Sequence, residues 1–301
     1  MTTETNRIAI VTGASGGIGA AVAERLAKDG FTVVVNYAGN AASAAAVVAR
    51  IEAAGGHAVA AQADISDVAA VARMFDSAET AFGGVDVLIN NAGIMNLATI
   101  ADSSDALFDR HIAVNLKGTF NTLREAARRL RDGGRIVNFS SSVTSLLQPT
   151  YGVYAATKAA VEAMTSILAK ELRGRNITVN AIAPGPTATK LFLDGKPQEV
   201  IERLSKLAPL ERLGQPQDIA DAVAFLAGPD GAWINGQTLR ANGGILIWSI
   251  TRRRRSMIKE VQAMKSRRNR FPIFAKAFPA TSLLARKNSL LASPGNFRPS
   301  V

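Results

Sequence analysis

Cysteine is absent from the 301-residue chain, and histidine occurs only twice, as His57 and His111. Without cysteine there is no disulfide framework, no thiol nucleophile and no thiolate ligand for a metal. Two histidines are too few for a histidine-based metal cluster. We therefore expect a protein that has no metal site.

Long apolar runs are also absent. No stretch reaches the roughly 18 apolar residues that a membrane-spanning helix needs. Residues 1–7 lack the apolar segment of a signal peptide. Hydrophobic residues nevertheless make up 48% of the chain, enough to fill one large core. The sequence predicts a soluble, cytoplasmic protein without membrane contact.

Acidic residues almost disappear toward the C-terminus. Residues 246–301 contain thirteen Lys and Arg residues and a single acid, Glu260, which gives a net charge of +12. The whole chain carries +11, so residues 1–245 carry −1. The basic character of the protein therefore belongs to its last segment and indicates nothing about the partners of the rest.

This change in composition predicts the domain organisation. We interpret residues 1–247 as a dinucleotide-binding catalytic domain and residues 248–301 as a basic C-terminal extension. Proline, serine and basic residues recur in the extension without strand periodicity, which is typical of disorder. A short basic helix with Met257, Val261 and Met264 on one side, suited to a polyanion, is the less favoured alternative.

Strand-like and helical segments alternate along the first 245 residues. Short apolar strands are expected at residues 7–12, 31–37, 57–63, 85–90, 135–139, 177–182 and 237–240. Helical patterns are expected at residues 18–28, 41–54, 68–82, 104–130, 154–173, 197–207 and 216–226. Such alternation predicts an α/β fold, a doubly wound (Rossmann-type) parallel sheet with helices on both faces.

Polar or glycine-rich segments follow four of these strands. They are residues 13–19, 90–93, 140–142 and 184–186. Ligands of doubly wound sheets bind beyond the carboxyl ends of the strands, where the strand order reverses. We therefore expect the four segments to form one site.

The turn Gly13-x-x-x-Gly17-x-Gly19 follows the first strand and opens the first helix. Glycines permit a tight turn and let a pyrophosphate approach the helix N-terminus, so we predict phosphate binding here. The same turn contains the G-x-S-x-G pattern of a hydrolase, centred on Ser15. A hydrolase triad of that type needs a late histidine, and none follows His111.

The end of the second strand indicates which dinucleotide binds. An NAD site typically has an acid there, whereas this chain has Asn36 and Tyr37. A neutral position leaves room for a 2′-phosphate contacted by Ser15, Asn36 or Tyr37, so we favour NADP over NAD. Asp64, after the third strand, is either a ligand of the adenine amino group or the N-cap of the helix that starts at residue 68.

Tyr154 and Lys158 are four residues apart and share one helix face. An ammonium group one turn away is expected to lower the pKa of the phenol. Ser141, thirteen residues earlier, is placed to hold a carbonyl oxygen near the phenol. The three indicate proton transfer to or from a C–O group. The alternative is a half-buried tyrosine and a solvated lysine.

Asn115 lies inside a long predicted helix. Asparagine is an indifferent helix former. It is either a solvated residue or a residue that bends the backbone to hold a water for proton relay, and the sequence does not choose between them.

Taken in order, these motifs resemble the short-chain dehydrogenase/reductase family over about residues 7–245, and within it the 3-oxoacyl-carrier-protein-reductase-like enzymes. The resemblance implies Tyr154 as general acid/base and Lys158 as the residue that holds the nicotinamide ribose and lowers the tyrosine pKa. It implies that Ser141 orients the substrate oxygen and that Asn115 completes a water-linked proton path. Ser142 is the second choice for the serine.

The resemblance also implies cofactor contacts outside the glycine turn. Asn91 and Gly93 would line the adenosine side, and Thr187 would lie near the nicotinamide amide. Further expected contacts are Ile18, Ile65, Ala92, Pro184 and Gly185. NADP enzymes of this family often carry a basic residue in the glycine turn, where this chain has Gly16.

The loop of residues 188–207 corresponds to the substrate cover of family members. Leu191, Phe192 and Leu193 would form an apolar lid, and Lys190 could meet an acidic group. The alternative is that these residues only pack against the helix that follows. The resemblance further implies a homo-oligomer, whose subunit contacts the C-terminal extension could disturb.

These observations predict an NADP(H)-dependent oxidoreductase that interconverts a carbonyl and an alcohol in a small-molecule substrate. The alternative is a non-catalytic dinucleotide-binding regulatory protein whose basic tail contacts a polyanion such as nucleic acid. Because all four catalytic positions carry the expected residue types, we favour the enzyme.

Overall fold

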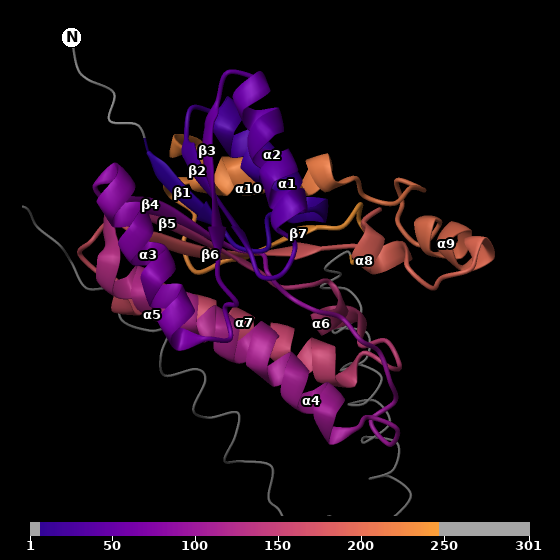
Figure 1. Cartoon of the computed structure of the whole chain (residues 1–301). Helices are drawn as coiled ribbons and strands as arrows, with labels where there is room; N and C mark the ends of the chain where they lie inside the picture. The colour runs from indigo at the N-terminus through magenta and orange to yellow at the C-terminus, as the bar shows by residue number, and fades with distance from the viewer. Residues whose placement is uncertain (1–6, 247–301) are drawn as a thin grey trace, which may run out of the picture. The chain divides into compact units, whose positions relative to one another are not determined.

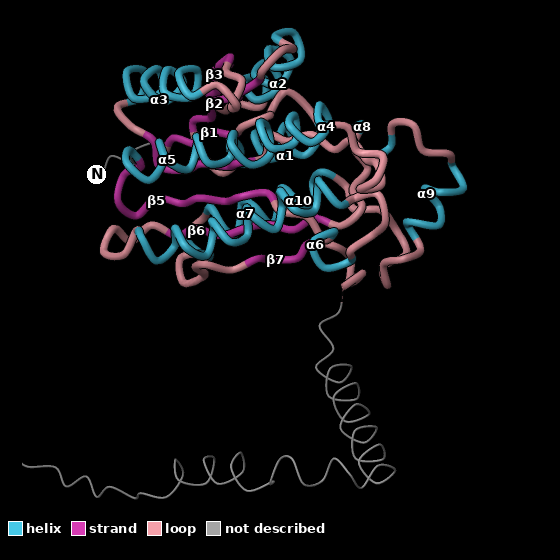
Figure 2. Tube along the Cα trace, turned by 90° about the horizontal axis from the view of Figure 1, so that it is seen from below, coloured by secondary structure: helices cyan, strands magenta, loops and turns pink. Residues whose placement is uncertain are grey.

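The computed structural model of the protein describes residues 7–246 (Figure 1). Seven parallel strands form one sheet in the order β3-β2-β1-β4-β5-β6-β7, which Figure 2 shows side by side. They are β1 (Ile8–Val11), β2 (Thr32–Tyr37), β3 (His57–Gln62), β4 (Val85–Asn90), β5 (Leu130–Phe139), β6 (Thr178–Pro184) and β7 (Thr238–Ala241). The order reverses between β1 and β4, so the predicted doubly wound sheet is confirmed.

Helices cover both faces of this sheet (Figure 1). One face is covered by α1 (Gly17–Lys28), α2 (Ala41–Ala53) and α10 (Pro216–Ala227). The other is covered by α3 (Val68–Phe82), α5 (Thr119–Arg129) and α7 (Gly152–Glu171). In β1, Ala9 and Val11 join the first core and Ile8 and Ile10 the second. Strands buried on both faces need apolar residues at every position, which explains the continuous apolar runs.

The prediction of a single helix over residues 104–130 is wrong for residues 112–118. The chain forms α4 (Asp105–His111), a π-helical segment η1 (Ile112–Gly118) and then α5. Asn115 lies in the π-helical segment, where its side chain binds the backbone of the loop after β4. Such local widening is typical of functional sites and leaves no signal in the hydrophobic periodicity.

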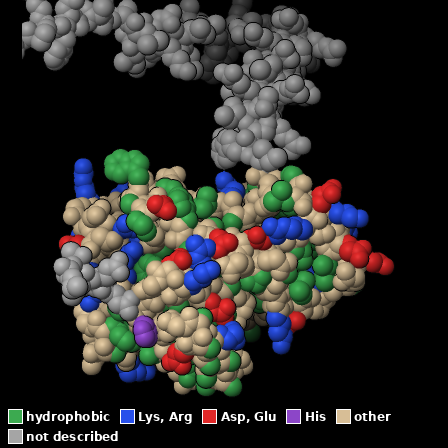
Figure 3. All heavy atoms as spheres, turned by 90° about the horizontal axis from the view of Figure 1, so that it is seen from above, with side chains coloured by type: hydrophobic (Ala, Val, Ile, Leu, Met, Phe, Trp, Pro, Cys, Tyr) green, Lys and Arg blue, Asp and Glu red, His purple; other side chains and the backbone are tan. Residues whose placement is uncertain are grey.

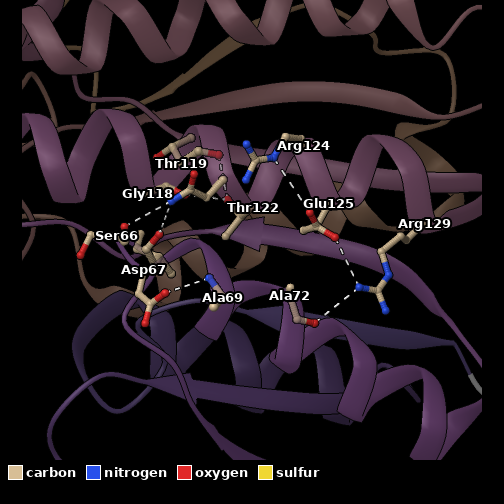
Figure 4. A network of polar contacts seen from close by, with 12 residues as sticks. Ser66, Asp67, Ala69, Ala72, Gly118, Thr119, Thr122, Arg124, Glu125 and Arg129 are labelled. Atoms are coloured by element: carbon tan, nitrogen blue, oxygen red, sulfur yellow. Dashed lines mark hydrogen bonds and ion pairs between the residues drawn. The ribbon is translucent and has the colours of Figure 1, made fainter.

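Polar contacts fasten α5 to α3 (Figure 4). Arg129 donates to Glu79 at 2.6 Å and Asp76 at 2.7 Å. It also donates to the carbonyl oxygen of Ala72 and forms an ion pair with Glu125 on its own helix. This network fixes the helix that follows the π-helical segment and so supports the position of Asn115.

Three short helices lie near the carboxyl ends of the strands and contribute residues to the site. They are α6 (Val143–Leu146), α8 (Lys190–Leu193) and α9 (Gln198–Ser205). The sequence predicted α9 but not α6 and α8, because four residues are too few to show a helical period. A single 3-10 turn, η2 (Pro229–Gly231), follows α10.

On the face shown in Figure 3, Lys and Arg side chains alternate with Asp and Glu side chains. This mixture agrees with the near-neutral charge of residues 1–245. None of the helices within residues 7–246 is both long and apolar enough to cross a membrane. The predicted extension of residues 248–301 and its possible polyanion contact lie outside the described residues.

Candidate active site

Two adjoining cavities lie at the carboxyl ends of the strands. The glycine-turn cavity, of about 530 Å³, is lined by the turn after β1 and by the ends of β2 and β3. The Tyr154 cavity, of about 220 Å³, is lined by Tyr154 and by segments that follow β4, β5 and β6. The residues common to both are Ile18, Asn91, Gly93, Ile94, Thr189 and Leu191. The four predicted segments therefore converge on one continuous site.

The glycine turn has the backbone that its sequence requires. Gly13 and Gly17 have φ values of 62° and 57°, which favour glycine. A Cβ at Gly13 would lie 2.8 Å from the Cα of Ala92, a cofactor contact predicted on the opposite wall. The helix α1 begins at Gly17, so its first amides point out of the helix without an internal partner and can bind an anion.

Gly19, predicted as a cofactor contact, lines neither cavity. A Cβ there would lie 2.5 Å from Nδ2 of Asn91 and from the carbonyl oxygen of Gly13. The absence of a side chain at this position lets α1 pack against the loop after β4. Gly19 thus shapes the site without facing it.

Of the predicted 2′-phosphate contacts, Ser15 and Asn36 line the glycine-turn cavity, whereas Tyr37 does not. Asn36 is buried, accepts a hydrogen bond from the Gly13 amide and donates to the carbonyl oxygens of Ala61 and Ala63. Its side chain is therefore already engaged in joining the ends of β1, β2 and β3. Tyr37 packs against the core beside α1 and does not line either cavity.

Asp64 and Ile65 line the glycine-turn cavity. Asp64 does not cap α3, because the N-cap is Asp67, so that alternative is wrong. The Asp64 carboxylate accepts hydrogen bonds from the amide and hydroxyl of Ser66, which lower its pKa, and Arg110 lies 3.9 Å away. Arg110 also lines the cavity and was not predicted, because α4 is remote from the glycine turn in the chain.

The Asn91–Gly93 loop lines the shared part of the site. Asn91 donates through its side chain to the carbonyl oxygens of Thr12 at 3.0 Å and Gly13 at 3.1 Å. The Thr12 hydroxyl accepts in return from the amides of Asn91 and Ala92. These bonds lock the loop to the glycine turn and leave the backbone of Gly93 facing the cavity.

The three consecutive serines after β5 have different surroundings. Ser140 donates to Glu162 at 2.5 Å, and Ser142 is buried, donates to the Ala183 carbonyl oxygen and accepts from Asn242. Of the three serines, only Ser141 lies close enough to the Tyr154 phenol to lower its pKa. The geometry therefore favours Ser141 over Ser142 as the partner of the tyrosine.

Tyr154 and Lys158 lie on one face of α7, as their spacing predicted, with Lys158 Nζ 5.8 Å from the centroid of the tyrosine ring. The predicted lowering of the tyrosine pKa is not found. Burial raises the pKa of Tyr154 to about 12, although the hydrogen bond with Ser141 opposes this. Lys158 is buried, donates to the Phe139 carbonyl oxygen at 2.8 Å, and its pKa is lowered to about 8 by the same desolvation.

Asn115 is fully buried, so the solvated alternative is wrong. Its Oδ1 accepts from the Ile94 amide at 2.8 Å, and its Nδ2 donates to the Ile94 carbonyl oxygen at 2.9 Å. A Cβ on Gly93 would lie 3.2 Å from Asn115 Oδ1 and 3.5 Å from Lys158 Nζ. Asn115 therefore reaches the same wall as the lysine, and the backbone around it is distorted as expected.

Two aromatic neighbours of Tyr154 had no assigned role in the sequence. The rings of His111 and Tyr151 each lie 6.4 Å from the Tyr154 ring in edge-to-face contact. His111 is buried, its Nδ1 lies 2.8 Å from the Leu107 carbonyl oxygen, and its Nε2 accepts from the Asn96 amide at 3.2 Å. Its position one helical turn before Asn115 was the available signal.

The predicted lid is correct only in part. Leu191 and Phe192 line the Tyr154 cavity, whereas Leu193 does not, and Lys190 lines the glycine-turn cavity instead. Thr189, which caps α8 by accepting from the Phe192 amide, lines both cavities and was missed. The other predicted residues of this wall, all lining the Tyr154 cavity, are Pro184, Gly185 and Thr187.

The fold is a doubly wound α/β domain in which a glycine turn and a tyrosine–lysine pair line one continuous site. The sequence matches a family described as Enoyl-(Acyl carrier protein) reductase over residues 13–246. It is 46% identical to the NADPH-dependent aldehyde reductase-like chloroplastic protein of Arabidopsis thaliana, over 79% of this chain and 93% of that protein. It is also 46% identical to a short-chain type dehydrogenase/reductase of Picea abies, over 79% and 92% of the two chains.

Solved structures give the same result. A dehydrogenase/reductase from Sinorhizobium meliloti superposes with a TM-score of 0.77 at 41% identity, covering 80% of this chain and 95% of that one. A short chain dehydrogenase from Burkholderia cenocepacia in complex with NADP superposes with a TM-score of 0.75 at 41% identity, covering 80% and 98%. The protein belongs to the short-chain dehydrogenase/reductase family and is an NAD(P)-dependent oxidoreductase.

Proposed function

We propose that the protein is an NADP(H)-dependent carbonyl reductase that uses Tyr154 as its general acid. The observation that carries the proposal is the meeting of Ser141 and Tyr154 in a cavity continuous with the glycine turn. A hydroxyl pair beside a dinucleotide site suits a carbonyl oxygen that receives a proton while its carbon receives hydride.

The residues fit a dinucleotide. The glycine turn and the N-terminus of α1 would hold the pyrophosphate, and Asp64 would face the adenine. Lys158 and Thr187 would lie on the nicotinamide side. When bound, the reduced cofactor supplies the hydride.

NADP is favoured over NAD by the end of β2, which has the neutral sequence Asn36-Tyr37-Ala38 in place of an acid. Ser15 lines the same cavity, and its hydroxyl forms no hydrogen bond with the described residues. Ser15 is our first candidate for a 2′-phosphate contact, because the Asn36 side chain, which lines the same cavity, already forms three hydrogen bonds. The names of the Arabidopsis relative and the Burkholderia structure, with NADPH and NADP, support this preference.

The chain's own residues would handle the proton. With a pKa of about 12, the Tyr154 phenol is protonated at neutral pH and can donate to the substrate oxygen. Ser141 would hold that oxygen beside the phenol. The phenolate left after transfer would lie next to Lys158, whose ammonium group stabilises it in a site of low dielectric.

The experiment is the substitution Tyr154→Phe, with Tyr151→Phe as matched control. Both tyrosines line the cavity, but only Tyr154 has Ser141 and Lys158 beside it. We expect Tyr154→Phe to lower kcat by at least about 10²-fold while NADPH binding, followed by its fluorescence, is kept. Near-normal turnover would exclude the mechanism. NADPH binding by the wild-type protein without reduction of any carbonyl compound would favour the non-catalytic alternative.

A further inference from the structure

The walls of the Tyr154 cavity that lie beyond Ser141 and Tyr154 are apolar. They come from the loop after β4, from α6, α8 and α9, and from the end of the described chain. The apolar side chains are Met95, Val143, Leu146, Leu191, Phe192, Leu204, Leu207 and Ile245. Leu191 and Leu207 are 55% and 47% exposed, so the wall includes apolar surface that a bound molecule would cover.

Charge is nearly missing from the same cavity. Of the described residues that line it, Lys158 alone has an ionisable acidic or basic group other than the tyrosine phenols. Its ammonium group donates to the Phe139 carbonyl oxygen at 2.8 Å and lies behind the Tyr154 ring. Lys190, the residue expected to meet an acidic group, lines the other cavity. A carboxylate entering with a substrate would therefore lose water without gaining a cation.

We infer that the substrate is an uncharged aldehyde or ketone with an apolar aromatic or alkyl body, and that carboxylate-bearing carbonyl compounds are excluded. The inference rests on the proposed reductase function and deepens it. The carbonyl oxygen would lie at Ser141 and Tyr154, and the apolar body would lie against α6, α8 and α9. Gln148 and Tyr151 would supply neutral polar contacts at the wall of the cavity.

The test compares two aldehydes that differ by one charge, benzaldehyde and para-carboxybenzaldehyde, with NADPH as reductant. We expect kcat/KM to be at least about tenfold lower for the acid, because its carboxylate has no free cationic partner in the cavity. Equal values for the two aldehydes, or a preference for the acid, would overturn the inference while leaving the reductase function in place.

Two exposed leucines three residues apart provide a matched pair of variants. Leu207 lines the Tyr154 cavity, whereas Leu210, 64% exposed, does not. Leu207→Arg should reduce the ratio of kcat/KM for benzaldehyde to that for para-carboxybenzaldehyde severalfold, because the arginine gives the carboxylate a cationic partner. Leu210→Arg should leave this ratio unchanged. The same change in both variants would show that net charge and not the cavity wall sets the preference, against the inference.

A binding measurement separates this inference from the proposed function. With NADP⁺ present, calorimetric titration should detect benzamide, an uncharged carbonyl compound, more readily than benzoate. Stronger binding of benzamide without any turnover of aldehydes would support the substrate class and reject the reductase. Stronger binding of benzoate would reject the substrate class whatever the turnover.

Discussion

The two halves of the site are built differently. Glycine and alanine are frequent in the lining of the glycine-turn cavity, and side chains such as Asn36 and Asn91 form hydrogen bonds with neighbouring strands and turns. The Tyr154 cavity is walled largely by apolar side chains on or next to short helices, and two of them, Leu191 and Leu207, are exposed. Backbone geometry tolerates few substitutions, whereas exposed apolar side chains can be exchanged. The first half is therefore suited to a constant cofactor and the second to a substrate that can change.

The comparison is tested most strongly at Gly13. Gly13→Ala adds a Cβ that would overlap the Ala92 backbone at 2.8 Å and places a non-glycine residue at φ 62°. Positive φ alone costs about 1 kcal/mol, and with the overlap we expect at least a roughly 10²-fold loss of NADPH affinity. Titration of NADPH fluorescence measures it.

Gly16→Ala is the control for that substitution. An added Cβ at Gly16 meets no atom within 4 Å, and its φ of −178° is open to any residue. NADPH affinity should stay within about twofold of wild type. A similar loss in both variants would show that the turn responds to any added side chain, and the contrast between rigid and tolerant regions would fail.

The second prediction concerns Lys158, which lies between the two halves. Burial lowers the pKa of Lys158 in the folded protein to about 8, whereas the ordinary lysine pKa is near 10.4. Between these two pH values the lysine is protonated in the unfolded chain and deprotonated in the folded protein. The stability of the wild type should therefore rise with pH over that window. Tyr154 acts in the opposite direction only above about pH 10, because its pKa is raised to about 12.

The measurement is urea unfolding of the wild type and of Lys158→Met from about pH 7 to about pH 10. The wild type should gain roughly 1–3 kcal/mol relative to the variant. Parallel pH profiles for the two proteins would contradict a buried lysine whose charged form is disfavoured.

The sequence predicted the cofactor half far better than the substrate half. Gly13, Gly17, Asn91 and Gly93 belong to short motifs at strand ends, and a parallel sheet necessarily brings such ends to one edge. The substrate wall comes from residues scattered along the chain, such as Met95 and Ile245, with no common spacing. Its helices α6 and α8 are also too short to leave a periodic pattern.

The direction of the tyrosine pKa shift was missed for a related reason. Spacing alone places an ammonium group near a phenol, but it does not report how deeply both are buried. In the folded protein the Lys158 ammonium donates to Phe139, and desolvation of the phenol sets the direction of its pKa shift. Likewise, Asn36 and Tyr37 both lie at the expected strand end, yet only Asn36 lines the glycine-turn cavity, and Tyr37 packs against the core.

The smallest effect is expected for substitutions of His111, which contacts the segment between the two cavities. Asn115 holds Ile94, which lines both cavities, and His111 holds the Asn96 amide two residues later. Since Nδ1 donates to the Leu107 carbonyl oxygen, Nε2 is free to accept. Loss of the Nε2 acceptor should release the Asn96 amide and loosen the end of the segment next to the Tyr154 cavity. Asn115 should still hold Ile94 in place.

Two substitutions separate the ring nitrogens. In His111→Gln the side chain retains an acceptor near the Nε2 position, and in His111→Asn it retains only a donor near the Nδ1 position. An unsatisfied amide costs about 1–3 kcal/mol when it is buried, and less at Asn96, which is exposed, so His111→Asn should raise KM for an aldehyde roughly threefold to tenfold. The Kd of NADPH should change less than about twofold, and His111→Gln should restore KM. If KM and Kd rose together in His111→Asn, the segment from residue 93 to residue 96 would behave as one rigid unit, and the two halves of the site would not be mechanically separable.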